Sequence, residues 1–154
     1  MATIYKPLFF LYFFLLLLNL PQQVQAQISI EGKDITGKWR TTDDKTGKVK
    51  SVVHIYKEND KYFGKIIQIF REPSEDQDPV CKSCQDYRKN QKVIGLVIIR
   101  NMVAHRNKLA DGDILDPETG DIYTCEIWLE NKDTLKMRGW WGFFYRTQIW
   151  QRSE

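Results

Sequence analysis

The sequence predicts an all-β fold, an eight-stranded antiparallel up-and-down barrel. Three observations predict it. Apolar and polar residues alternate in most segments, as in half-buried strands. Turns rich in Asp, Asn and Gly separate these segments at short intervals, as in β-sandwiches and barrels. The chain also ends in an aromatic stretch, residues 138–152, that holds three of its five tryptophans, and aromatic residues favour strands.

The first 26 residues are expected to be a secretory signal peptide. Lys6 is their only charge, residues 8–20 are almost wholly apolar, and Val24 and Ala26 provide small residues before a cleavage point. The apolar run is shorter than the roughly 20 residues that span a bilayer. An uncleaved anchor is the alternative. We therefore expect a periplasmic or secreted protein without stable membrane insertion after cleavage.

Residues 27–154 have the size of one domain. Without Lys6, this part carries 22 basic and 20 acidic residues, a charge of about +2. The two signs are interspersed along the chain. Nucleic-acid binding normally requires a basic face or stripe, so no nucleic-acid partner is expected. The charge indicates no particular oligomeric state or protein partner.

Three strands are expected in the first half of the domain. Residues 43–47 and 58–60 have the composition of turns. The segment after the first turn alternates clearly, and Gly64 in the next one marks a bulge or a bend of the barrel. The expected strands are residues 35–42, 49–57 and 61–70.

The middle of the chain breaks this pattern. Residues 71–92 are polar, contain Pro73 and Pro79, and show no apolar period. A loop of this length is usually functional, stapled or mobile. Residues 93–99 are apolar and fit either a buried strand or a helical turn. Residues 101–110 are expected to be irregular.

The last four strands follow with tight turns between them. Residues 116–120 combine Asp, Pro and Gly in a strong turn. Eight strands can close into a barrel, which removes exposed edges. Such a barrel is either filled by its own side chains or holds one small ligand. The expected strands are residues 112–115, 122–130, 134–141 and 144–152, with 93–99 as the fourth.

Several segments resemble known families. Gly37-Lys38-Trp39 on the first strand and Arg152 on the last are similar to the signature of the calycin superfamily, the lipocalins and fatty-acid-binding proteins. There, the Trp packs near the barrel base and the Arg covers it. More closely, the chain resembles DUF2147, a family of uncharacterised exported bacterial proteins. The resemblance implies a lipocalin-like barrel in the cell envelope, and it transfers no catalytic residue. The segments that carry it are 37–39, 54–66, 93–99, 114–129 and 135–150.

The three cysteines, Cys81, Cys84 and Cys125, have several interpretations. Export favours a structural disulfide. Either Cys81 is bonded to Cys84, which is the pair that we predict, or one of these two cysteines is bonded to Cys125. A zinc site would need four ligands, and only Cys125 and His105 could complete one. A redox-active CxxC normally lies at the N-terminus of a helix in a βαβ unit. The sequence around Cys81 and Cys84 shows no βαβ pattern. We expect no metal and no cofactor.

No catalytic set is evident. His54 and His105 lack a Ser or carboxylate partner at motif spacing, which general-base chemistry requires. Asp111, Asp113 and Asp116 lack the spacing of a calcium loop. An enzymatic activity is left open and none is favoured.

Arginines on the aromatic strands suggest a ligand site. Guanidinium groups facing the lumen would suit an anionic head group. We favour the simpler interpretation that Arg152 only stacks on Trp39 and the other arginines are solvated or span the sheet, since a buried unpaired charge is costly. If a ligand binds, Arg152→Ala should abolish binding and Lys50→Ala should not. The candidate ligand-binding residues are Trp39, Tyr123, Arg138, Arg146, Trp150 and Arg152.

Two functions therefore follow from the sequence. The first is an exported binding module for a small amphipathic or anionic molecule. The alternative is a structural or protein-interaction protein of the cell envelope, with its lumen filled by Trp39, Phe63, Tyr123 and Trp150. A cavity of about 300 Å³ or more would favour the first function.

Overall fold

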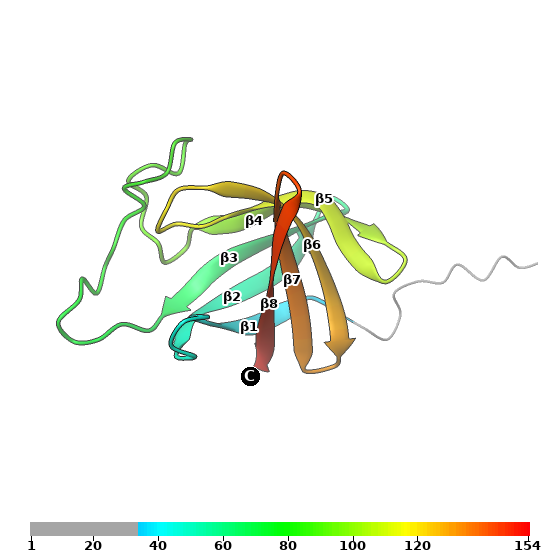
Figure 1. Ribbon diagram of the computed structural model, residues 1–154, viewed down its shortest axis with the longest axis horizontal. Helices are drawn as coiled ribbons and strands as arrows, with labels where there is room; N and C mark the ends of the chain where they lie inside the picture. Colours follow the sequence, from blue (N-terminus) through cyan, green and yellow to red (C-terminus); the bar gives the residue numbers. More distant parts are fainter. Residues whose placement is uncertain (1–33) are drawn as a thin grey trace, which may run out of the picture.

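The computed structural model describes residues 34–154, so the expected signal peptide and its cleavage point lie outside the described residues. The described part forms one closed antiparallel barrel in which each strand pairs with its neighbours in sequence (Figure 1). The predicted eight-stranded up-and-down barrel is confirmed. The strands are β1 (Gly37–Thr42), β2 (Val49–Glu58), β3 (Lys61–Ile69), β4 (Val97–His105), β5 (Lys108–Leu115), β6 (Ile122–Asn131), β7 (Thr134–Trp141) and β8 (Phe144–Ser153).

Pairing of the first strand with the last closes the barrel. Trp39 on β1 is opposite Arg152 on β8, with a further residue pair on each side. Where the two strands pair, their backbone groups are satisfied and offer no free edge to template aggregation. Among residues 34–154, no helix is long and apolar enough to cross a membrane.

The region around residues 101–110 differs from the prediction. It was expected to be irregular, but it holds the end of β4, a tight turn and the start of β5. Asn101 and Asp111 have φ angles of 57° and 61°, and the register shifts between Leu109 and Gly112. Left-handed residues and bulges disturb the alternation of side chains, which hides these strands from a search for periodicity.

The apolar core fills one half of the barrel. On β6, Cys125, Ile127 and Leu129 are buried, as their alternation predicts. The strands pack so closely that a Cβ atom on Gly112 would lie 2.3 Å from the carbonyl oxygen of Arg100. The other fully buried large side chains include Trp39, Val53, Ile55, Ile99, Met102, Leu109 and Leu135.

The long β3–β4 loop contains the disulfide. Cys81 and Cys84 are bonded, with their Cα atoms 5.5 Å apart, which confirms the predicted pair. Cys125 is a free, buried thiol inside the barrel, and its burial raises its pKa to about 12. The disulfide therefore lies within the loop and does not fasten the loop to the barrel.

A buried arginine fastens the loop instead. Arg88 has no exposed surface and donates hydrogen bonds to both carboxylate oxygens of Asp86 and to the carbonyl of Val97, where β4 begins. Arg100 on β4 lies between Asp86 and Asp113 of β5, at 3.6 and 3.0 Å. The hydrogen bonds from Arg88 hold the pKa of Asp86 below its usual value, so this carboxylate is charged at neutral pH.

The loop also packs on the turn between β5 and β6. Gly120, with φ +81°, lies so close to the loop that an added Cβ atom would be 2.1 Å from the carbonyl oxygen of Ser83. No other residue fits this contact, because L side chains rarely adopt this φ and the space is occupied. The loop, which projects from one end of the barrel in Figure 1, is thereby held beside the β5–β6 turn.

Candidate functional site

One half of the barrel is open. A cavity of about 1450 Å³ extends into the lumen from the end where the β1–β2 and β3–β4 loops, the β5–β6 turn and the β7–β8 hairpin meet. It far exceeds the space that would indicate a ligand site. The apolar residues that line it are Val49, Ile66, Ile69, Phe70, Pro79, Val80, Val93, Ile98, Ile114, Leu115, Pro117, Tyr123, Met137, Trp141, Phe144, Tyr145 and Trp150.

Polar groups deep in the cavity are already paired with one another. The hydroxyl groups of Thr41 and Ser51 share a hydrogen bond of 2.8 Å between β1 and β2. The indole N–H of Trp150 donates to the side-chain oxygen of Gln148 at 3.2 Å. Within residues 34–154, no buried side-chain nitrogen or oxygen is left without a partner. The inner wall is therefore mainly an apolar surface with few polar positions.

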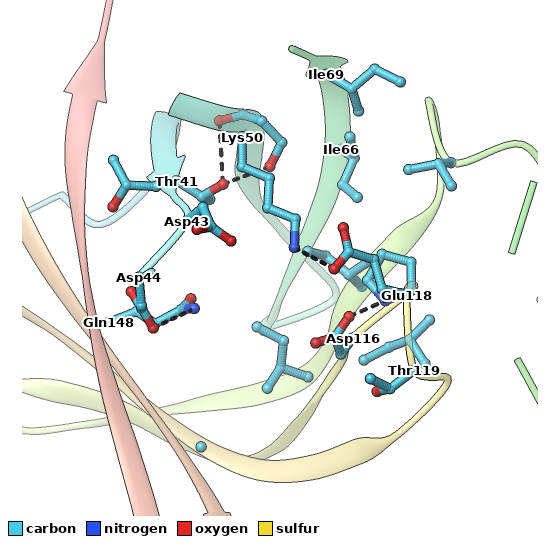
Figure 2. Close-up of a pocket in the computed structure, with 18 of the residues that line it drawn as sticks. Thr41, Asp43, Asp44, Lys50, Ile66, Ile69, Asp116, Glu118, Thr119 and Gln148 are labelled. Carbon is cyan, nitrogen blue, oxygen red and sulfur yellow. Dashed lines mark hydrogen bonds and ion pairs between the residues drawn. The ribbon is translucent and has the colours of Figure 1, made fainter. Parts of the chain in front are cut away.

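Ion pairs connect the elements around the mouth. The Lys50 ammonium of β2 lies 2.9 Å from the Glu118 carboxylate on the β5–β6 turn, and Figure 2 shows this side chain crossing the cavity. Lys48 pairs with Glu72 of the β3–β4 loop at 2.7 Å. Arg146 of β8 pairs with Asp44 of the β1–β2 loop. Loops far apart in sequence are therefore held around one opening.

The charges at the mouth balance. The lining includes six basic and six acidic residues, several of them in the pairs above. The hydrogen bond from Lys48 lowers the pKa of Glu72 and raises that of Lys48, so this pair stays charged near neutral pH. An anionic ligand would have to compete with a carboxylate for each paired cation.

The structure divides the residues predicted for a ligand site into three groups. Tyr123 and Trp150 line the cavity, and Arg146 stands at its mouth. Trp39 and Arg152 lie at the opposite, closed end, where the guanidinium carbon is 4.2 Å from the centre of the indole ring. Arg138 is outside the cavity lining.

Arg138 belongs to an aromatic cluster on the outer face of β6, β7 and β8. Its guanidinium carbon lies 4.3 Å from the ring centre of Tyr145 and 5.2 Å from that of Trp128. Its Nε donates to the hydroxyl of Thr147. This arginine therefore covers the outside of the sheet.

Arg152 seals the closed end. It donates hydrogen bonds to the carbonyl oxygens of Lys132, Thr36 and Asp34. Trp39 beneath it is fully buried, and its indole N–H donates to the carbonyl of Ile35. The simpler interpretation of Arg152, stacking on Trp39, agrees with this geometry.

The position of Lys50 inside the cavity mouth was not predicted. From the sequence we expected Arg152 to be in the ligand site and Lys50 to be outside it, but Lys50 lines the cavity and Arg152 does not. The register between β1 and β2 shifts at Thr41 and Thr42, opposite Val49 and Ser51. Alternation cannot reveal this shift, because a bulge reverses which side chains face inward. Residue type gave no signal either, because β2 also contains Ser51, His54 and Lys57.

The residues considered for zinc do not come together. His105 lies at the β4–β5 hairpin and is 2.6 Å from the Asp111 carboxylate, whereas Cys125 is buried beside Met102. In the described part of the chain, no three His, Cys, Asp or Glu residues are grouped as a metal would require. Neither histidine lines the cavity.

Comparisons with known proteins agree with this architecture. The family model DUF2147, described as an uncharacterized protein conserved in bacteria, matches residues 37–152. Among solved structures, the barrel is similar to protein HP1028 from Helicobacter pylori, described as belonging to the lipocalin family. The two share 16% sequence identity with a TM-score of 0.67, over 79% of this chain and 84% of that one. At this identity the likeness concerns the fold. No match is found among curated proteins.

Proposed function

The chain belongs to the DUF2147 family of bacterial proteins, and from that premise we propose that it is an exported binding module for a small amphipathic molecule. The apolar part of the ligand lies in the open half of the barrel. Its polar or anionic head lies at the mouth, near Lys50 and Arg146. The protein works in the periplasm or outside the cell.

The open cavity carries this proposal. Ligand sites are concave and mostly apolar, with a few polar groups that orient the ligand. The cavity here combines an aliphatic and aromatic inner wall with charged groups confined to the mouth. A barrel serving only as a structural element would be expected to fill this space, because empty apolar volume reduces stability. The lipocalin-like fold is consistent with small-molecule binding.

A substitution that fills the lumen tests the proposal. Gly139 lines the cavity, and a side chain there would project next to Tyr123, whose Cβ atom would be 3.4 Å from the new Cβ atom. We expect Gly139→Leu to weaken binding of a dansyl-labelled fatty acid at least tenfold, because the added side chain occupies the ligand's volume. Titration of probe fluorescence measures the effect.

The matched control adds the same side chain outside the barrel. Thr124 is exposed on β6, adjacent to Tyr123 in sequence, so Thr124→Leu should leave the probe affinity unchanged. Thermal unfolding of both variants verifies that they remain folded. The proposal fails if wild-type protein does not bind the probe and protein purified from its own host shows only the unliganded mass in native mass spectrometry.

The proposed location has a separate test. If the chain is exported with its signal peptide removed, protein from the periplasm or the medium should begin at Gln27. N-terminal sequencing and intact mass identify the first residue. A chain recovered only from the cytoplasm with an intact N-terminus would refute export, whatever the result of the binding experiment.

A further inference from the structure

The tip of the β7–β8 hairpin exposes four aromatic side chains. Trp141, Phe143, Phe144 and Tyr145 are 74%, 98%, 73% and 57% exposed. Contiguous apolar patches are uncommon on soluble proteins and usually indicate an interaction site. The proposed ligand site accounts for only part of this tip. Trp141, Phe144 and Tyr145 also line the cavity, but Phe143, the most exposed of the four, does not.

The tip is a narrow, well-defined projection. Trp141 pairs with Phe144, so that only Gly142 and Phe143 form the turn. Gly142 has φ +58°, as the first central residue of a type II′ turn requires. The two strands project together at the top of Figure 1. They carry the aromatic side chains to the mouth of the cavity, whose lining includes Trp141, Phe144 and Tyr145.

We propose that this hairpin tip docks the protein on the surface of a phospholipid bilayer. Trp and Tyr side chains prefer the membrane–water interface, where the ring is in an apolar layer and the polar atom is hydrated. Phe inserts its whole ring at the boundary with the acyl chains. The tip offers all three residue types at its end, and no charged residue lies between Arg138 and Arg146.

Charge at the base of the tip suits phosphate head groups. Arg138 and Arg146 lie on the two strands that carry the tip and pair with residues across the hairpin. Arg146 is paired with Asp44. Arg138 takes part in none of the ion pairs found within residues 34–154, and its Nε donates to the hydroxyl of Thr147. A guanidinium group in this position can bind a phosphate in a bidentate manner.

The shape of the tip argues against a second protein as the occupant. A stable protein interface uses about 20–30 residues on each side, far more than a two-residue turn and its neighbours provide. A bilayer requires no complementary surface. Docking at this end also turns the cavity mouth toward the membrane, because Trp141, Phe144 and Tyr145 belong to both the tip and the lining.

A vesicle-binding experiment tests the proposal. The full chain is purified as the host leaves it, its N-terminus is identified by mass, and it is mixed with vesicles of phosphatidylcholine and phosphatidylglycerol in equal parts. We expect the wild-type protein to sediment with the vesicles and Phe143→Asp to lose affinity about tenfold or more, as burial of a Phe ring implies. All variants have the same N-terminus, so only the hairpin differs among them.

The control places the same charge on the wall of the barrel. Ile149 is 49% exposed on β8 and lies away from the turn, so Ile149→Asp should bind vesicles like the wild type. Brominated lipids should quench tryptophan fluorescence, and Trp141→Phe should remove most of this quenching. Phe143→Asp should retain wild-type affinity for the dansyl fatty acid, which separates membrane docking from ligand binding.

Three results would overturn the proposal. The first is that the wild-type protein does not sediment with vesicles, and the second is that Phe143→Asp binds them as well as the wild type does. The third is a dimer in ultracentrifugation that Phe143→Asp dissociates, which would mean that a second copy of the chain occupies the tip.

Discussion

At the closed end of the barrel Trp39 is fully buried under Arg152, whereas at the open end Trp141 is 74% exposed. The same residue type therefore has two roles in one sheet. The closed end joins β1 to β8 and satisfies its polar groups with backbone carbonyls. The open end is held by ion pairs between loops, around a space that the protein does not fill. From this comparison we expect stability to reside mainly in the first region, and the proposed ligand recognition belongs to the second.

Two single variants, each lacking one of these tryptophans, test the comparison. They have the largest expected difference in the free energy of unfolding. Trp39→Ala should lower the free energy of unfolding by about 3–5 kcal/mol, because it leaves a cavity in a packed core. Trp141→Ala should change it by no more than about 0.5 kcal/mol, since an exposed side chain is removed. Equilibrium unfolding in urea measures both. Similar losses for the two variants would mean that the ends do not differ in this way.

The β3–β4 loop lies at the open end, but we expect its buried Arg88 to contribute to stability. A substitution of Arg88 tests this expectation. Arg88→Met should lower the free energy of unfolding by about 2–4 kcal/mol, because it leaves Asp86 without its buried partner. Arg88 lowers the pKa of Asp86 in the folded protein. This contribution is present above the unfolded pKa, 3.8, and is lost as the pH falls through the lowered folded value.

The acid sensitivity of the variant provides the second measurement. In urea titrations at a series of pH values, the difference between wild type and Arg88→Met should shrink in acid. Lys89→Met, an exposed neighbour in the same loop, serves as the control and should follow the wild type. A constant difference at all pH values would show that Arg88 acts only by packing.

A small effect on stability is also expected for the ion pair of Lys50 at the cavity mouth. Lys50→Met removes an ion pair whose partners are 39% and 56% exposed, and such pairs contribute less than about 1 kcal/mol. Its effect on binding should be selective. Affinity for a dansyl fatty acid should fall several-fold, while a neutral dansyl alcohol of equal length should bind as before. Equal losses for both probes would exclude a head-group role for Lys50.

Local patterns predicted most of the strands. The alternation of residues 122–130 agrees with the burial of Cys125, Ile127 and Leu129 on one face of β6, and the turn at 116–120 was evident from its Asp, Pro and Gly. The prediction was wrong where the backbone departs from regular strand geometry. Left-handed Asn101 and Asp111 concealed the β4–β5 hairpin, and a bulge near Thr41 concealed the inward position of Lys50.

The candidate site was predictable only in part. Of the candidate ligand-binding residues, Tyr123, Arg146 and Trp150 line the cavity. The position of each residue along the barrel axis depends on the register between strands that are far apart in sequence. This register places Trp39 and Arg152 at the closed end of the barrel and Lys50 and Glu118 at the open end. The periodicity of a single strand contains no information on this register.

The sequence by itself predicted most of the strands and turns and favoured the pairing of Cys81 with Cys84, because these depend on neighbours in the chain and on local backbone chemistry. The tertiary structure decided which half of the lumen is filled, where the β3–β4 loop is fastened and which charges meet at the mouth. These features depend on contacts between residues tens of positions apart, whose distances are fixed only when the barrel closes.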